Sequence, residues 1–261
     1  VLAASFAHSE ALQRHVRFLY SSGSMYLCMN GNLLFHGCIP MNEDGSFERV
    51  EVDGEKYAGR ALLDRLERAA REAYFLPKDH PDKQKNVDKM WLLWCSAQSP
   101  LFGKSRMSAF ERYFTKEKAL HEEVYNSYYR LSADSHVCEQ ILKEFGVDPV
   151  HGHIINGHVP VRQKDGENPV KADGKLYVID GGLSKAYQAK IGIAGYTLIF
   201  NSHYLALAQH HDYISHPLSK PESDDMPTLQ ITQKMDKRIL VSDTDAGKKL
   251  SQRIEELSLL V

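Results

Sequence analysis

Residues 25–37, MYLCMNGNLLFHG, contain two apolar runs joined by Asn30-Gly31. An Asn-Gly pair favours a tight hairpin turn because both residues tolerate positive φ angles. We therefore expect two antiparallel strands here. The second strand would deliver His36 to its carboxyl end and stop at Gly37.

Helices are expected on both sides of this hairpin. One should run from Ser9, as N-cap, to Gly23, and residues 58–146 should be helical almost throughout. Apolar side chains in 58–146 recur at helical spacing, and we interpret them, aromatic residues included, as core. The four stripes are Leu62, Leu66, Ala69 and Ala73; Val87, Met90, Trp91, Trp94 and Cys95; Leu120, Val124, Tyr128 and Leu131; and Val137, Ile141, Leu142 and Phe145.

From residue 147 the apolar pattern alternates with period two, as strands require. The runs are HIINGH, KLYVIDGG, GYTLIFNS, YLALAQHH, PTLQITQ and KRILVSD, and an amphipathic helix with Leu250, Ile254 and Leu257 on one face closes the chain. An earlier hairpin is expected at Asp53-Gly54. The pattern predicts a mixed fold, α+β or α/β, in which 58–146 is a helical insertion between 1–57 and 147–261.

Composition narrows the class of protein. The chain has 261 residues, of which 43% are hydrophobic and 25% charged, as in an ordinary globular protein. Its net charge of −2 argues against a general binder of nucleic acid or anionic membranes. No apolar run is long enough to span a bilayer, and the first residues lack the basic region of a signal peptide. Because the chain starts at Val1 rather than Met, we expect it to be part of something longer.

The chain contains 13 histidines, and histidine is the residue type here that most clearly suggests metal binding. His36 and His158 each follow an apolar strand and have a glycine beside them, which is a common way to present an imidazole to a metal ion. A hydrogen-bonded structural role is the alternative for each. The group His151, His153 and His158 has no cysteine near it, so a closed zinc site is not expected there. The four cysteines are far apart and are expected to be reduced thiols.

Basic residues mark two stretches that could bind phosphate. Lys104, Arg106 and Arg112 lie in the break SPLFGKSRMSAFERYF, and Lys185 follows Gly181-Gly182 after an expected strand. Backbone N–H groups and an ammonium could hold a phosphate there. The stretch is not a P-loop, and lysines on turns are also typical of an ordinary solvated surface.

Several long runs, taken together, carry a resemblance to a known family. SMYLCMNGNLLFHGCIPMNEDGSF, SPLFGKSRMSAFERYF, HIINGHVPV, GENPVKADGKLYVIDGGLSKAYQAKIGIAGYTLIFNS and KRILVSDTDAGKKLSQRIEEL occur in this order over essentially the whole chain. They resemble the class III fructose-1,6-bisphosphatases of bacteria, within the calcineurin-like metallophosphoesterases. The resemblance implies a metallophosphoesterase β-sandwich flanked by helices, of which this chain is the C-terminal portion.

The resemblance also implies a two-metal site that this chain completes only in part. His36 and His158 match the positions at which the superfamily's His-Gly and Gly-His strands supply ligands. The superfamily's Asp-x-His, Gly-Asp and Gly-Asn-His motifs precede the first of these strands, and none lies upstream of His36. Gly157-His158 also lacks the second histidine of a Gly-His-x-His form.

The activity implied is hydrolysis of the 1-phosphate of fructose 1,6-bisphosphate by water that two Mn²⁺ ions activate. The basic residues Lys104, Arg106, Arg112 and Lys185 would bind the phosphates. The resemblance places this enzyme in gluconeogenesis in the cytoplasm. If this chain folds by itself, the missing strands leave an exposed sheet edge that favours self-association, so homo-oligomers are an option. Neither nucleic acid nor membrane is expected as partner, because the chain is not basic and has no long apolar run. A phosphoprotein or dinucleotide phosphatase of the same superfamily is the alternative activity. A catalytically incomplete fragment without turnover is the alternative state of this chain by itself.

Overall fold

The computed structural model of the chain describes residues 1–108, 111–182, 192, 195–210 and 227–259. The chain divides into two compact units. Unit 1 comprises Val1–Leu27 and Phe35–Leu131, and unit 2 comprises Cys28–Leu34 and Ser132–Val261.

Strands in the described residues form three sheets. A five-stranded sheet has the order β1-β2-β5-β7-β6, a three-stranded sheet the order β10-β9-β8, and β3 and β4 form a hairpin. The strands are β1 (Tyr26–Met29), β2 (Asn32–Phe35), β3 (Val50–Val52), β4 (Glu55–Tyr57), β5 (His153–Asn156), β6 (Val170–Lys171), β7 (Leu176–Val178), β8 (Gly195–Phe200), β9 (Tyr204–His210) and β10 (Thr228–Lys234).

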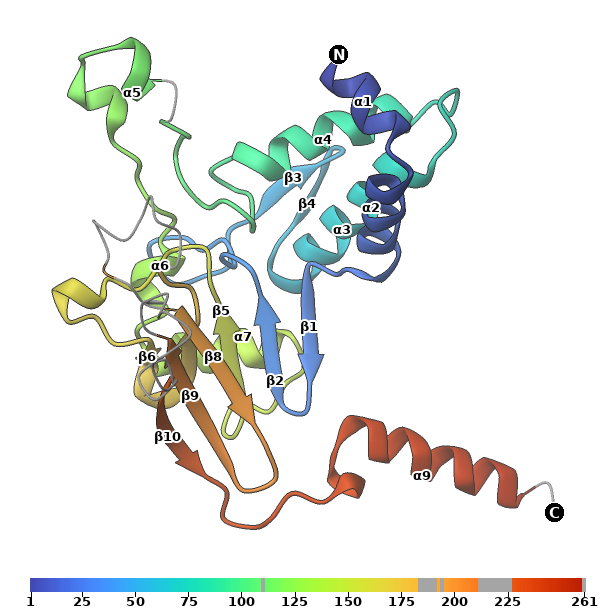
Figure 1. Ribbon diagram of the computed structural model, residues 1–261, viewed down its shortest axis with the longest axis vertical. Coiled ribbons are helices and arrows are strands. Elements are labelled where there is room, and N and C mark those ends of the chain that lie inside the picture. The colour runs from blue at the N-terminus through green and yellow to red at the C-terminus, as the bar shows by residue number, and fades with distance from the viewer. Residues whose placement is uncertain (109–110, 183–191, 193–194, 211–226, 260–261) are drawn as a thin grey trace, which may run out of the picture. The chain divides into compact units, whose positions relative to one another are not determined.

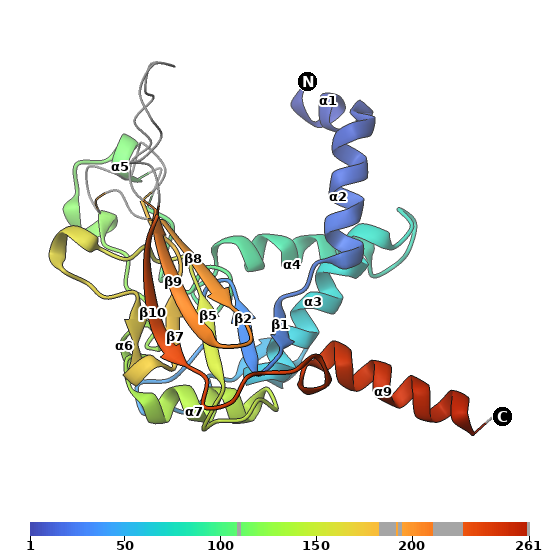
Figure 2. The same cartoon turned by 60° about the horizontal axis from the view of Figure 1, so that its bottom comes forward.

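Unit 2 is built from two sheets that pack face to face (Figures 1 and 2). β2, β5 and β7 run parallel to one another, whereas β8, β9 and β10 are antiparallel. The core between the sheets contains Ile155 and Tyr177 of the first sheet and Leu205 of the second, all at most 4% exposed. The alternating inward residues of both sheets thus supply the core of unit 2.

Unit 1 has its core between helices and the β3–β4 hairpin. The helices are α1 (Leu2–His8), α2 (Glu10–Ser22), α3 (Gly59–Phe75), α4 (Lys83–Cys95) and α5 (Glu111–Phe114), with the short η1 (Lys118–His121) and α6 (Tyr128–Leu131). Val50 and Val52 of the hairpin pack on Leu62 and Leu66 of α3 and on Leu93 of α4.

The helical segments of unit 2 are α7 (Ser135–Glu144), η2 (Gln163–Asp165), η3 (Ala172–Gly174), η4 (Val241–Asp243) and α9 (Asp245–Ser258). Asp134 caps α7 by accepting from the His136 N–H, and Thr244 caps α9 by accepting from the Gly247 N–H. In the described part of the chain, no helix has both the length and the apolar character that crossing a bilayer requires.

Many of the predicted elements are confirmed. α2 begins after Ser9 and ends before Gly23, and Asn30-Gly31 turns between β1 and β2 with φ angles of 50° and 76°. The Asp53-Gly54 hairpin, the stripe on α3 and the stripe on α7 also occur as predicted. The chain is accordingly a mixed α and β protein.

The predicted core stripe on α4 is wrong for its two tryptophans, although its Met90 does pack on the core of unit 1. Trp91 and Trp94 are 66% and 61% exposed, and only Asn86 and Leu93 of this helix are buried. The two indole rings contact each other edge to face, with centroids 5.3 Å apart. Helical spacing correctly placed these side chains together, but α4 packs through the edge that carries Leu93 instead.

Two further predictions fail where hydrogen bonds override the apolar pattern. The stripe at residues 120–131 is not one helix, because η1 ends at His121 and Lys104 forms a β-bridge with Tyr125. KRILVSD is not a strand, because the Asp243 carboxylate accepts from the Leu240 N–H at 2.8 Å and closes η4. Side chains that bond nearby backbone compete with strand formation in this way.

A buried polar bridge links the two sheets of unit 2. His153 of β5 is 8% exposed, and its Nε2 lies 2.7 Å from Oε1 of Gln233 on β10. The Tyr177 hydroxyl donates to Oγ1 of Thr232, also on β10, at 3.0 Å. Burial lowers the pKa of His153, an effect that nearby Lys175 reinforces and that the bond to Gln233 only partly offsets.

Because the pKa of buried His153 is lowered, we expect the stability of unit 2 to fall in acid. Unfolded His153 takes up a proton near pH 6.5, whereas the folded form resists protonation until a lower pH, so stability falls as pH drops through 6.5. Thermal melting at pH 7.5 and pH 5.5 measures the loss. His153→Gln removes the titrating group, so its melting temperature should fall less over this interval. An identical fall in both proteins would contradict the prediction.

Candidate functional site

His36 and His158 follow two neighbouring strands. His36 comes directly after β2 and is exposed, and His158 comes two residues after β5 and is half-buried. β2 and β5 pair in parallel, with Leu33 opposite Ile154. Each histidine therefore follows the carboxyl end of its strand, where open α/β sheets most often carry their binding residues.

Gly37 fixes the backbone just after His36. A Cβ atom at Gly37 would lie 2.5 Å from the carbonyl oxygen of Pro100, so this position has no room for a side chain. The neighbouring Cys38 N–H donates to that same oxygen at 2.9 Å. The segment that carries His36 is thus held against the backbone of the loop at residues 99–103, immediately before the basic stretch.

Cys38 anchors this contact and is not a nucleophile. Its side chain is 0% exposed, and its thiol donates to the Ser99 carbonyl at 3.7 Å. Burial raises the pKa of the Cys38 thiol to about 12, so the reactive thiolate is scarce at neutral pH. Gly103 completes the packing, because a Cβ there would lie 2.6 Å from the Cys38 sulfur.

His158 adopts an unusual backbone conformation. Its φ angle is 68°, in the left-handed region, which costs a non-glycine residue roughly 1–2 kcal/mol. Its Nε2 atom is buried. Backbone strain at a residue able to bind a metal is typical of functional sites. This strain could not be predicted from the sequence, because the neighbouring Gly157 is the residue expected to take a positive φ angle.

The basic stretch of unit 1 surrounds an acidic residue that sequence reasoning missed. Lys104 Nζ lies 3.4 Å from Oε2 of Glu123, whose Oε1 accepts from the Ser108 hydroxyl at 2.7 Å. Arg112 Nε in turn donates to that Ser108 hydroxyl at 3.0 Å. Burial alone would raise the pKa of Glu123, but the Ser108 hydrogen bonds and the Lys104 charge outweigh it and lower the pKa.

Lys104 and Arg112 are therefore brought together, with one carboxylate offsetting part of their charge. Lys104 also lies over the rings of Phe102 and Tyr125, at 5.7 and 5.2 Å. Arg106 is exposed. Lys185 lies outside the described residues.

The other histidines near His158 have different partners. His151 Nδ1 lies 2.8 Å from the Asp148 carboxylate, and His153 faces Gln233. Across the described residues, no group of three or more His, Cys, Asp or Glu side chains is arranged to hold a metal ion. A complete metal centre would need donors beyond this set.

Comparison with known proteins identifies the family. The family described as Firmicute fructose-1,6-bisphosphatase matches residues 1–261. Fructose-1,6-bisphosphatase class 3 of Clostridium novyi (strain NT) is 50% identical over 261 residues, which are 100% of this chain and 39% of the relative. The class 3 protein of Clostridium botulinum (strain Langeland) matches with the same identity and coverage.

The match covers this chain completely and the relatives only partly. The chain spans 39% of the length of the curated relatives it matches, within their C-terminal portion. No solved structure matches it significantly. The chain belongs to the Firmicute fructose-1,6-bisphosphatase family.

The close approach at Gly37 predicts that Gly37→Ala disturbs the segment after His36. The added methyl group must push Gly37 away from Pro100, at a cost of about 1–3 kcal/mol. The buried Cys38 thiol should then react with a disulfide reagent that does not reach it in the unchanged protein. Thiol titration, with thermal melting alongside, measures both effects.

Gly45→Ala is the matched control. Gly45 has a positive φ of 83° but no atom within 4 Å of an added Cβ, so this change strains the backbone without pushing on Cys38. Its Cys38 should stay unreactive. If Cys38 remains protected in Gly37→Ala as well, the contact with Pro100 does not hold this segment.

Proposed function

We propose that the longer protein to which this chain belongs removes the 1-phosphate of fructose 1,6-bisphosphate, with divalent metal ions as cofactor. The observation that carries the proposal is the family match over every residue of the chain, together with relatives of 50% identity named as fructose-1,6-bisphosphatase class 3. The alternative substrates, phosphoproteins and dinucleotides, have no comparable support.

His36 and His158 are the proposed metal ligands of this chain. Their positions after the carboxyl ends of two adjacent parallel strands support this role, as does the strained backbone of His158. Imidazole nitrogen is a suitable donor for Mn²⁺, which we propose as the metal. Bound divalent ions would polarise the phosphate and lower the pKa of the attacking water.

Two histidines are too few for a two-metal site, so the other ligands would come from the remainder of the longer protein. The two sheets of unit 2 would belong to a metallophosphoesterase sandwich, and their face-to-face packing is compatible with this. The helical insertion at 58–146, location in the cytoplasm and homo-oligomers remain predictions.

Lys104, Arg106 and Arg112 are the proposed phosphate-binding residues within the described chain, and Lys185 is a further candidate. Arg112 and Arg106 are exposed, so their guanidinium groups can meet a ligand. Lys104 already pairs with Glu123, so a phosphate must compete with that carboxylate for it. We therefore expect the arginines to matter more for substrate binding than Lys104 does.

Tests need a protein that contains the remainder. A joined protein can be made by placing the part of the Clostridium novyi relative that precedes the matched region before Val1 of this chain. The joined protein keeps every residue of this chain. This chain by itself should release no phosphate from fructose 1,6-bisphosphate with Mn²⁺ present, and the joined protein should release it. Robust turnover by the 261-residue chain would contradict the incomplete metal site.

In the joined protein, His36→Ala and His158→Ala should each lower activity roughly 100-fold or more, because each loses a metal–nitrogen bond. Phosphate release and bound metal, the latter measured by elemental analysis, should fall together, and excess Mn²⁺ should restore part of the activity. His151→Ala is the matched control, since His151 is exposed and pairs with Asp148. Normal metal content and activity in His158→Ala would rule out its role as a ligand.

Arg106→Ala in the joined protein should raise KM for the sugar bisphosphate about tenfold and leave kcat nearly unchanged, as expected when one ion pair to a ground-state phosphate is lost. Excess Mn²⁺ should not restore the KM of Arg106→Ala, because this change does not affect how much metal the protein binds. Lys116→Ala, a nearby exposed lysine outside the proposed set, is the control. Steady-state kinetics distinguish the outcomes, and an unchanged KM would remove Arg106 from the site.

A further inference from the structure

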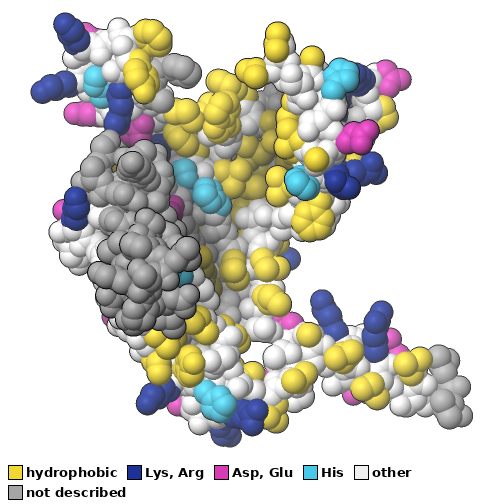
Figure 3. Space-filling model, in the orientation of Figure 1, with side chains coloured by type: hydrophobic (Ala, Val, Ile, Leu, Met, Phe, Trp, Pro, Cys, Tyr) yellow, Lys and Arg dark blue, Asp and Glu magenta, His cyan; other side chains and the backbone are white. Residues whose placement is uncertain are grey.

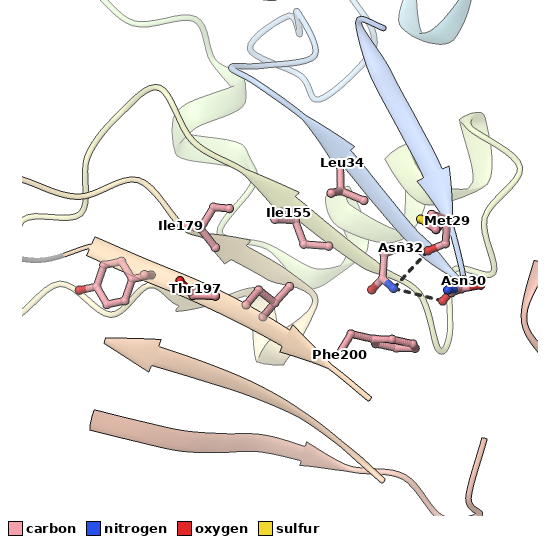
Figure 4. A pocket seen from close by; sticks show the side chains of 10 residues that line it. Met29, Asn30, Asn32, Leu34, Ile155, Ile179, Thr197 and Phe200 are labelled. Carbon is pink, nitrogen blue, oxygen red and sulfur yellow. Dashed lines mark hydrogen bonds between the residues drawn. The ribbon is translucent and has the colours of Figure 1, made fainter. Parts of the chain in front are cut away.

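A cavity of about 430 Å³ lies in unit 2, between its two sheets (Figure 4). Its lining comes from β1, β2, β5, β8 and the end of β7, and includes Met29, Asn32, Leu34, Ile179, Leu198 and Phe200. Several of these residues, Leu34, Ile179, Leu198 and Phe200 among them, also pack on the core cluster around Ile155. The cavity is therefore an extension of the core between the sheets, with apolar walls.

Among the residues that the structure describes, one buried polar atom in the wall has no hydrogen-bond partner. Asn32 is 7% exposed, and its Nδ2 donates to the carbonyls of Met29 and Asn30 at 3.3 and 3.1 Å. Because carbonyl oxygens can only accept, these bonds fix which end of the amide is nitrogen. The other end, Oδ1, is buried without a hydrogen bond and lies on the cavity side (Figure 4). A buried acceptor left unpaired is unfavourable, so an occupant with an N–H donor would be favoured.

The cavity lies next to two sheet edges. In the described residues, β1 and β8 are the end strands of their sheets, and both contribute to the lining. Strands at an edge have unpaired backbone N–H and C=O groups, which bind further extended chain. On β1, Leu27 and Met29 are 49% and 52% exposed, so apolar surface continues along this edge.

We propose that this cavity is filled by an extended apolar segment from the part of the longer protein that precedes this chain, with one of its backbone N–H groups donating to Asn32 Oδ1. The chain spans only 39% of its relatives' length, so most of the polypeptide lies outside it and can supply the segment. Mostly apolar walls, the buried Asn32 acceptor and the adjoining strand edges fit a strand with apolar side chains. This inference depends on family membership and not on the metal ligands or the reaction.

Thiol protection tests it. In a background with Cys28→Ser and Cys95→Ser, Leu198→Cys places a thiol in the half-buried cavity wall. A maleimide should modify this thiol readily in the 261-residue chain and roughly tenfold or more slowly in the joined protein, where the segment covers it. Ile231→Cys is the control. Ile231 is 47% exposed on β10, does not line the cavity, and should react equally in both proteins.

Backbone hydrogen exchange of β8 gives a second readout that needs no substitution. Exchange at β8 should slow in the joined protein relative to this chain. Equal Leu198→Cys reactivity and equal exchange in the two proteins would overturn the proposal. Protection in this chain alone that increases with its concentration would assign the cavity to a second copy and would also overturn it. Neither measurement involves turnover, so a failure here is separate from a failure of the proposed activity.

Discussion

The parallel pairing of β2 with β5 is the constraint on which the proposed chemistry of this chain depends. The two strands are separated by more than a hundred residues, which include α3, α4 and α7, yet Asn32, Leu33 and Leu34 lie opposite His153, Ile154 and Ile155. Because side chains alternate along a strand, a shift of one residue would exchange the side chains that face the second sheet with those on the opposite face. Leu33 and Ile154 are both fully buried, which opposes such a shift. The same register determines where each strand ends and therefore where the chain turns into His36 and His158.

The role of glycine near the two histidines differs between the sites. At His36, Gly37 is needed for space, because the Pro100 carbonyl occupies the volume of a side chain. At His158, the strained residue is the histidine itself, with its positive φ angle. The sequence pattern of a strand followed by histidine and glycine is alike in the two places, but the physical reason for it is not. A larger residue at position 37 would therefore collide with the Pro100 carbonyl whatever backbone angles it could adopt.

Sequence reasoning succeeded where the signal is local. The Asn30-Gly31 and Asp53-Gly54 turns and the stripes of α3 and α7 follow from short-range steric and apolar patterns, and the structure contains them. It failed for Trp91 and Trp94, which are exposed. Periodicity shows which side chains share a face of a helix, but it does not show whether another element packs on that face. Within the candidate site, the two strand-end histidines and the basic stretch could be proposed from the sequence. Glu123, which pairs with Lys104, could not, because nothing in the sequence links residues 19 positions apart without a regular element between them.

The position of the two tryptophans determines what optical measurements on this chain report. The sequence contains only two, Trp91 and Trp94, and both lie on α4 of unit 1. Fluorescence excited selectively in tryptophan therefore observes unit 1 alone, and because both indoles are largely exposed, their emission changes little when that unit unfolds. Unit 2 contributes tyrosine, including the buried Tyr177, but no tryptophan. A calorimetric trace would then record the unfolding of both units, whereas a tryptophan emission trace of the same sample would record nothing of unit 2 and little of unit 1.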